Sequence, residues 1–220
     1  MFSCKLQAWY APYRLWRGEF LVCLERIETM EASKLALILA SASPRRRDFL
    51  KQMGLSFRVC PARGEEKIEP GWRPEEIASH LAKQKAWEVA SGHPKDTVIG
   101  ADTIVVLGSE VLGKPKDREQ AVHMLRMLSG KTHQVMTGVW VILDGKGYGF
   151  VQKTEVTFYH LTESEIGQYV ETGEPMDKAG AYGIQGLGMT LVKNINGDYS
   201  NVVGLPVARL MRLLRQLGQL

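Results

Sequence analysis

The chain contains 220 residues, of which 45% are hydrophobic and 24% are charged, a composition typical of a globular protein with one domain or two lobes. The net charge is only +4 and the sequence has no RNP, zinc-finger or basic-helix pattern, which argues against a nucleic-acid partner and suits a small anionic substrate. No apolar run approaches the ~20 residues that cross a bilayer, and the three cysteines form no CxxC pair, so we expect no membrane partner and a reducing, cytoplasmic location.

Residues 1–33 differ from the rest of the chain because they show no clear helical or strand period. The apolar piece 20–24 is too short for the core of a signal peptide. Met30 lies a few residues before the first clear strand. We therefore interpret 1–33 as an N-terminal extension, either disordered or upstream of the true start, with a partner-binding arm as the alternative. Residues 34–220 are interpreted as the functional domain.

The first clear strand, over 35–40, is followed by an arginine-rich turn. Ser43 and Pro44 are typical of the cap and first position of a helix, which we expect to end at Gly54. A helix N-terminus carries partial positive charge, so three arginines at 45–47 are unfavourable there unless an anion binds. Helical phase directs Arg45 and Arg46 toward a pocket at the sheet edge and Arg47 into solvent. A solvated basic turn is the alternative interpretation.

The later elements alternate at first and then include a long hairpin. We predict strands over 56–60, 98–107, 135–143, 149–159 and 189–195, helices over 74–90, 117–128 and 162–172, and a final amphipathic helix that begins at Pro206. A loop covers 61–73, and a turn around 144–147 joins the two strands of the hairpin. This order predicts an α/β fold with a mixed, twisted sheet and flanking helices.

Two charged residues interrupt apolar patterns. Asp102 lies in the middle of the 98–107 strand, where a carboxylate is costly to bury without a cation or hydrogen bonds. A metal-binding or catalytic role would explain it, and a carboxylate that accepts backbone N–H groups at a break near Gly100 is the alternative. Lys85 falls at the centre of the apolar face of the 74–90 helix, where it must reach solvent or meet an anion.

Other candidates are weaker by themselves. Glu65 and Glu66 supply loop carboxylates that could join Asp102 around Mg²⁺. Lys114 is a rigidly presented cation between a glycine and a proline, and Gln185, within the glycine-rich segment 179–186, could read a base edge with its amide. The five histidines have no metal-ligand spacing, and the chain contains neither a GxSxG elbow nor a Walker lysine, which argues against serine hydrolases and P-loop NTPases.

Taken together, a series of short motifs resembles the Maf family of nucleoside triphosphate pyrophosphatases over residues 35–217. The motifs are Ser41-Ala-Ser-Pro-Arg-Arg46, the Glu65-Glu66 loop, Lys85, Gly100-Ala-Asp-Thr-Ile-Val105, Gly113-Lys-Pro115, Leu128-Ser-Gly130, Asp177-Lys-Ala-Gly-Ala-Tyr-Gly-Ile-Gln-Gly186 and Asn201-Val-Val-Gly-Leu-Pro206. Each motif is short, but their common order makes the set highly specific.

This resemblance implies a hydrolase that depends on a divalent cation, Mg²⁺ or alternatively Mn²⁺, and that cuts a nucleoside triphosphate between its α and β phosphates. It implies that Asp102 is the proton acceptor or a metal-linked acid and that Glu66 helps to bind the metal. The phosphate-binding residues would be Ser41, Arg45, Arg46, Lys85 and Lys114. Arg45, Thr103 and Gln185 match the dTTP/UTP-cleaving branch, in which these positions set base choice.

The resemblance also implies two lobes around a central cleft, as in inosine triphosphate pyrophosphatases, together with a homodimer and a link to septum formation. A nucleotide-binding regulator of division without important catalysis and a pyrophosphatase for modified nucleotides are the alternatives. One geometric expectation follows from the motifs. Asp102 and Thr103 face opposite sides of an ideal strand, so for both to line one site we expect a bulge or break near Gly100.

Overall fold

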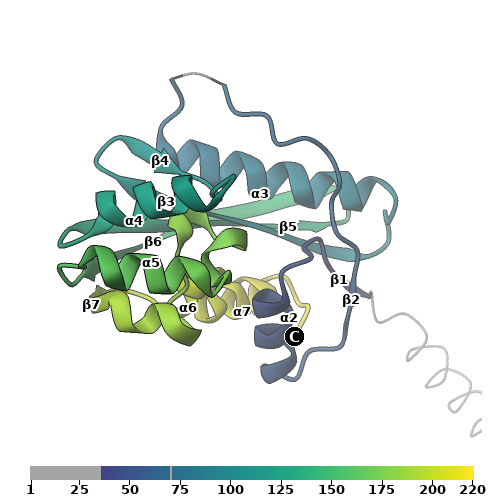
Figure 1. The fold of residues 1–220 in the computed structure, drawn as a ribbon. Coiled ribbons are helices and arrows are strands. Elements are labelled where there is room, and N and C mark those ends of the chain that lie inside the picture. Colours follow the sequence, from purple (N-terminus) through teal and green to yellow (C-terminus); the bar gives the residue numbers. More distant parts are fainter. Residues whose placement is uncertain (1–35, 70) are drawn as a thin grey trace, which may run out of the picture. The chain divides into compact units, whose positions relative to one another are not determined.

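The computed structural model describes residues 36–69 and 71–220, so the predicted extension 1–33 lies outside the described residues. The described part contains a seven-stranded sheet (Figure 1). Its strand order is β2 (Phe57–Val59), β1 (Leu37–Leu39), β3 (Thr97–Leu107), β5 (Thr132–Leu143), β6 (Lys146–Phe158) and β7 (Val192–Asn196), and the short β4 (Glu110–Leu112) also pairs with β3. β2, β1 and β3 are parallel, whereas the other pairs are antiparallel. The predicted α/β class with a mixed sheet is confirmed.

Helices cover both faces of the sheet. Helix α3 (Pro74–Ser91) packs on one face, and the opposite face carries α2 (Pro44–Gln52), α4 (Arg118–Leu128), α5 (Glu163–Glu171), α6 (Tyr199–Val203) and α7 (Val207–Gln216) (Figure 1). Two glycines let α3 approach the sheet closely. A Cβ on Gly100 would lie 2.5 Å from the Ala82 carbonyl oxygen, and one on Gly138 would lie 2.1 Å from that of Ala78. The small residues of β3 and β5 therefore determine how deeply α3 is seated.

The face opposite α3 has two separate apolar clusters. One contains Leu50, Ile99 and Leu210, and joins β1 and β3 to α2 and α7. The other contains Val105 and Leu125, and joins the far part of β3 to α4 and α5. Residues 36–220 form one compact unit, so the two expected lobes are not separate units in the structure.

Most predicted elements are confirmed, and the differences lie at element ends and in short pieces. The first strand is shorter than predicted, and the segment predicted as a strand from 189 begins as a 3₁₀ helix, Gly186–Leu191. Sequence reasoning missed β4 and α6. The predicted hairpin is longer than expected, because β5 and β6 turn through only two residues, Asp144 and Gly145, with positive φ values of 49° and 69°.

Candidate active site

A cavity of about 810 Å³ lies where β1 ends and β3 continues. β1 pairs with β3 from Thr97 to Ile99, and β4 pairs with it again from Val105. Between these points, no strand of the described residues covers the edge of β3 at 101–104. All nine predicted site residues line the cavity: Ser41, Arg45, Arg46, Glu66, Lys85, Asp102, Thr103, Lys114 and Gln185. The structure thus brings the whole predicted set to one cavity, while the role of each residue remains a prediction.

The expected bulge near Gly100 is wrong. Asp102 pairs with Gly138 and Thr103 pairs with Thr137 in an unbroken antiparallel register with β5. The two side chains therefore lie on opposite faces of the sheet, and the cavity reaches both of them around the uncovered edge of β3. The absent side chain of Gly100 serves a different purpose, the close approach of α3.

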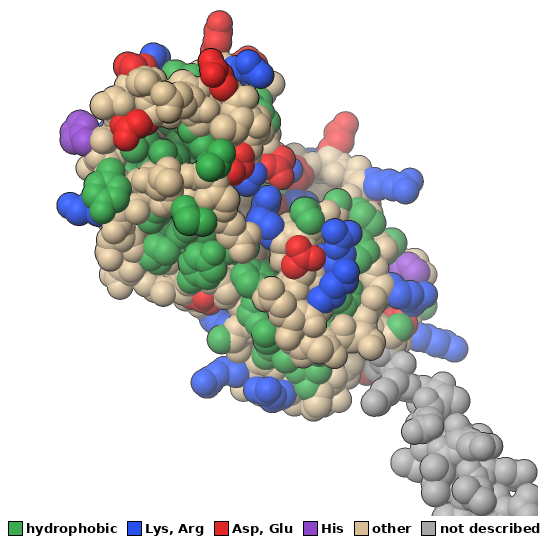
Figure 2. All heavy atoms as spheres, turned by 60° about the horizontal axis from the view of Figure 1, so that its bottom comes forward, with side chains coloured by type: hydrophobic (Ala, Val, Ile, Leu, Met, Phe, Trp, Pro, Cys, Tyr) green, Lys and Arg blue, Asp and Glu red, His purple; other side chains and the backbone are tan. Residues whose placement is uncertain are grey.

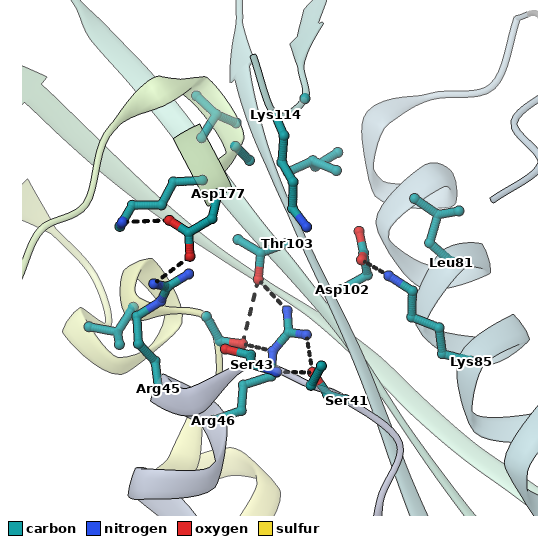
Figure 3. A pocket seen from close by; sticks show the side chains of 18 of the residues that line it. Ser41, Ser43, Arg45, Arg46, Leu81, Lys85, Asp102, Thr103, Lys114 and Asp177 are labelled. Carbon is teal, nitrogen blue, oxygen red and sulfur yellow. Dashed lines mark hydrogen bonds and ion pairs between the residues drawn. The ribbon is translucent and has the colours of Figure 1, made fainter. Parts of the chain in front are cut away.

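An acidic and basic cluster lies on the α3 face of the cavity. Lys85 contacts the Oδ1 atom of Asp102 (Figure 3) and lies 2.7 Å from the Oε1 atom of Glu66. The side chains of Lys85 and Asp102 are only 21% and 13% exposed. Burial by itself lowers the pKa of Lys85, but the two carboxylates outweigh burial and raise this pKa above its usual value. Lys85 is therefore a permanent cation between two acids, which is the anion contact predicted from its place on the helix.

One turn of α3 holds the loop that carries Glu66. The Glu88 carboxylate accepts hydrogen bonds from the backbone N–H groups of Arg63 and Gly64, at 2.7 and 3.1 Å. The Gln84 amide donates to the carbonyl oxygen of Glu65 at 2.6 Å. Together with Lys85, these side chains place the Glu66 carboxylate beside Asp102.

Arg46 occupies the other face of β3. Its guanidinium donates to the Gly204 carbonyl at 2.8 Å, to Ser41 Oγ at 3.0 Å and to Thr103 Oγ1 at 3.1 Å (Figure 3). Burial lowers the pKa of Arg46, and the negative charge of Asp102 opposes this effect; guanidinium nevertheless stays protonated in proteins. Arg46 thus joins α2, β3 and the end of α6 at the base of the cavity.

The Thr103 side chain contacts the buried hydroxyl of Thr137. Its Oγ1 atom lies 2.9 Å from Thr137 Oγ1, and Thr137 donates its hydrogen to the Asn201 carbonyl at 3.1 Å. Because that hydrogen is already used, Thr103 is the donor toward Thr137. The Thr103 oxygen acts as an acceptor toward Arg46, and it also lies 3.5 Å from the Gly204 carbonyl oxygen.

The three arginines of the turn separate as helical phase predicts. Arg45 and Arg46 line the cavity, whereas Arg47 does not, and the Arg47 side chain is 46% exposed beside Asp48. Arg45 Nη1 lies 3.4 Å from Asp177 Oδ2 at the opposite wall (Figure 3). Ser43 occupies the cap position but its side chain makes no capping bond, and its backbone N–H donates to Ser41 Oγ at 3.3 Å.

The remaining wall is formed by two loops. Lys114 follows β4 and extends toward Asp102 and Thr103 (Figure 3), while Gln185 comes from the glycine-rich segment together with Tyr182 and Ile184. Asp177 also lines the wall, and sequence reasoning assigned it no role although it begins a recognised motif. In the space-filling view, acidic and basic side chains meet where the surface is hollowed (Figure 2).

Two of the three carboxylates that line the cavity, Asp102 and Glu66, are candidates to bind a cation. Within the described part of the chain, no three His, Cys, Asp or Glu residues gather as a complete metal site. Asp102 and Glu66 nevertheless contact the same Lys85 ammonium, so their oxygens are close neighbours. Mg²⁺ is commonly bound by one or two carboxylates and completed by substrate phosphates and water, so this donor set fits it. In the described chain, no helix has the length and apolar character needed to span a membrane.

The α/β fold and a cavity lined by arginines, lysines and three carboxylates define a protein suited to a polyphosphate ligand. The family model described as Maf-like protein matches residues 36–217, so the chain belongs to the Maf family. A dTTP/UTP pyrophosphatase of Agathobacter rectalis is 53% identical over 200 residues, covering 83% of this chain and 97% of that protein. Proteins of the same name from Bacillus pumilus and Bacillus velezensis are 50% and 52% identical over 182 residues, covering 83% of this chain and 96% of each relative.

Proposed function

We propose that this protein hydrolyses dTTP and UTP to the nucleoside monophosphate and pyrophosphate. The observation that carries the proposal is the meeting of four cations, Arg45, Arg46, Lys85 and Lys114, with the Asp102 and Glu66 carboxylates in one cavity. Cations balance a triphosphate, and carboxylates serve the attacking water and a metal. The relatives that carry the name dTTP/UTP pyrophosphatase, at about half identity over most of their length, support the same reaction.

The reaction is an in-line attack of water on the α-phosphorus. The new bond joins the water oxygen to the α-phosphorus, and the bond to the α–β bridging oxygen breaks, so that pyrophosphate leaves with the electron pair. Lys85 contacts Oδ1 of Asp102, so Oδ2 is the oxygen that accepts the proton of the attacking water. Arg45 and Lys114 stabilise the charge of the leaving pyrophosphate, and Arg45 exchanges Asp177 for a phosphate oxygen as substrate binds.

We also propose a divalent cation, Mg²⁺ or alternatively Mn²⁺, held by Asp102 and Glu66 together with the substrate phosphates. When bound, it supplies positive charge that offsets the triphosphate. Chelation with EDTA should abolish pyrophosphate release, and added Mg²⁺ should restore it. Activity that survives chelation would contradict the metal proposal and leave the cations of the chain as the source of charge.

We assign base recognition to two uncharged polar residues that line the cavity, Gln185 and Thr103. The Gln185 amide can donate to and accept from a pyrimidine edge, and Thr103 offers an acceptor oxygen. A pocket that does not contact the 5-methyl group tightly would accept both bases, because one methyl group changes binding by only ~1–3 kcal/mol.

The test is pyrophosphate release from a panel of nucleoside triphosphates that includes dTTP, UTP, dCTP and inosine triphosphate. Release from dTTP and UTP first is the expected result. Release only from modified or non-standard nucleotides would retain the chemistry and overturn the base assignment. Nucleotide binding without release from any member would favour the regulator of division.

We further propose that the protein acts on free nucleotides rather than nucleic acid, as a homodimer in the cytoplasm with a link to septum formation. Family membership supports this assignment. Light scattering on the purified protein tests the dimer, and a monomer at all concentrations would contradict it.

A further inference from the structure

The segment 183–188, which carries Gln185, is held from outside the cavity by two side chains that do not line it. Tyr169 belongs to α5, and Glu174 opens the following 3₁₀ helix, Glu174–Asp177. The Tyr169 hydroxyl donates to Glu174 Oε1 at 3.0 Å and accepts from the Gly183 N–H at 3.1 Å. The pair is thus a continuous hydrogen-bonded unit that begins on one side of Gln185.

The Glu174 carboxylate also binds the backbone that follows Gln185. Leu187 N–H donates to Glu174 Oε2 at 2.9 Å, and Gly188 N–H donates to Glu174 Oε1 at 3.0 Å. Gly186 has a φ of +71°, and a Cβ there would lie 2.7 Å from Glu174 Oε2. The backbone after Gln185 is therefore bound directly by Glu174, and the backbone before it is bound through Tyr169.

The ionisation states fit these bonds. Burial alone raises the pKa of Glu174, but the two backbone N–H donors and the Tyr169 hydroxyl outweigh burial and lower it below the usual value. Burial, reinforced by the Glu174 charge, raises the pKa of Tyr169 well above the usual value. Glu174 is therefore a carboxylate acceptor, and Tyr169 keeps the proton that it donates.

The segment held in this way adds no cation to the cavity. Its lining residues are Gly183, Ile184 and Gln185, next to Tyr182, whereas the lysines and arginines come from α2, α3 and other loops. Lys178 lines the cavity beside Gly183, but its charge is paired with Asp177 at 2.6 Å. The amide of Gln185 matches the polar edge of a base, and the lysines and arginines of the other walls match phosphates.

We infer that Tyr169 and Glu174 form a clasp, called here the Tyr169–Glu174 clasp, which positions Gln185 to select the base without contributing to phosphate binding. Both are positioning residues, since neither lines the cavity. The inference rests on the proposed function for its substrate, and on the hydrogen bonds around 183–188 for its geometry.

Two variants remove the clasp in different ways. Tyr169→Phe deletes the hydroxyl and keeps the ring, and Glu174→Gln removes the charge while keeping the length of the side chain. The matched control is Glu165→Gln, because the Glu165 carboxylate accepts the Thr162 N–H at 2.7 Å at the start of α5 and does not line the cavity. Thermal unfolding of all three checks that each variant is folded.

Kinetics separates base selection from phosphate binding. In both clasp variants we expect the ratio of kcat/KM for dTTP over dCTP to fall about 10-fold, with the loss in KM for dTTP. The inhibition constant of inorganic tripolyphosphate, which probes only the phosphate wall, should stay within about twofold, a change that corresponds to well under 1 kcal/mol. A parallel weakening of tripolyphosphate, or an unchanged dTTP/dCTP ratio, would overturn the clasp.

Hydrogen exchange tests the clasp without activity. The amides of Gly183, Leu187 and Gly188 should exchange about 10-fold faster in the clasp variants than in wild type and in Glu165→Gln. Unchanged exchange would overturn the inference. Absence of pyrophosphate release from wild type would instead overturn the proposed function, and the exchange data would still decide the clasp.

Discussion

Asp102 and Thr103 are consecutive residues of β3 that point to opposite faces of the sheet and nevertheless line one cavity. Asp102 contacts Lys85 of α3 on one face, whereas Thr103 accepts a hydrogen bond from Arg46 of α2 on the other. The cavity extends around the edge of β3 that lies between its pairing with β1 and its pairing with β4. The Asp102 carboxylate and the Thr103 hydroxyl are thereby fixed by a single peptide unit, and the chain needs no irregular strand to bring them to one cavity.

Asp102→Asn should reduce kcat for dTTP by about 10²–10⁴-fold, the range typical of a lost proton acceptor. Asparagine keeps the shape of the side chain and an oxygen for Lys85, so KM should change only a few-fold. The measurement is steady-state pyrophosphate release. Asp96→Asn is the control, because Asp96 pairs with Arg58 at 2.6 Å and does not line the cavity. Near-normal turnover in Asp102→Asn would contradict the assignment.

Lys85→Gln should lower kcat/KM for dTTP about 10- to 100-fold, the loss expected for a charge-assisted hydrogen bond worth about 1.5–3 kcal/mol. The substitution also leaves Asp102 and Glu66 without their shared cation. Lys83→Gln is the matched control on the same helix, since Lys83 lies 5.0 Å from the centre of the Trp140 ring and does not line the cavity. Equal effects of the two substitutions on kcat/KM would show that general charge, and not the position of Lys85, matters.

Gly100→Ala should destabilise the fold by about 3 kcal/mol, because the new Cβ would lie 2.5 Å from the Ala82 carbonyl oxygen and would push α3 away from the sheet. Gly92→Ala is the control. Gly92 follows α3 in a right-handed helical conformation, and its nearest contact would be 3.8 Å away. Urea unfolding measures both variants, and equal stability of the two would contradict the packing argument.

His133 should make stability depend on pH. It is buried beside Phe158 and lies 2.8 Å from the Tyr182 hydroxyl, and burial lowers its pKa from 6.5 to about 4. Between these values the unfolded chain binds more protons than the folded one, so stability rises with pH. The contribution is fully present above pH 6.5 and is lost as the pH falls toward 4.

The expected loss from His133 between pH 7 and pH 4.5 is about 2–3 kcal/mol. Urea unfolding at both pH values measures it, with His133→Gln as the reference, because glutamine can still bond to Tyr182 and does not titrate in this range. The wild type should lose more stability than the variant over this interval. An identical loss in both proteins would show that His133 does not titrate differently in the folded state.

Sequence periodicity predicted the long elements because each has a continuous apolar stripe and a local end signal. α3 and α5 begin at Pro74 and after the Thr162 cap, as their sequences indicate. β4 and α6 were missed because three and five residues are too short for a period to be recognised. Local sequence patterns do not predict short elements whose structure depends on contacts with residues far away in the chain.

The candidate site was predictable in its residues and not in its geometry. Lys85 on an apolar helix face and Asp102 in an apolar strand are each charged residues in apolar surroundings. Their ion pair compensates for the burial of both charges. The position of the cavity depends on β1 ending beside Ile99 while β3 continues, which is a property of strand pairing and not of local sequence. For the same reason Gly100 suggested a bulge, although its contact with α3 only appears in three dimensions.

The uncovered edge of β3 at 101–104 also has a consequence for self-association. An unpaired strand edge is a template on which another chain can add a strand, and long edges of this kind promote aggregation. Here β1 pairs with β3 on one side of the opening and β4 pairs with it on the other, so the stretch of this edge that no described strand covers, 101–104, is short. Ala101, Asp102 and Ile104 are also buried, so this edge is too short and too enclosed to accept a foreign strand. Within the described part of the chain, the peptide groups of 101–104 therefore have no partner strand at the cavity, and the fold still prevents another chain from pairing with them.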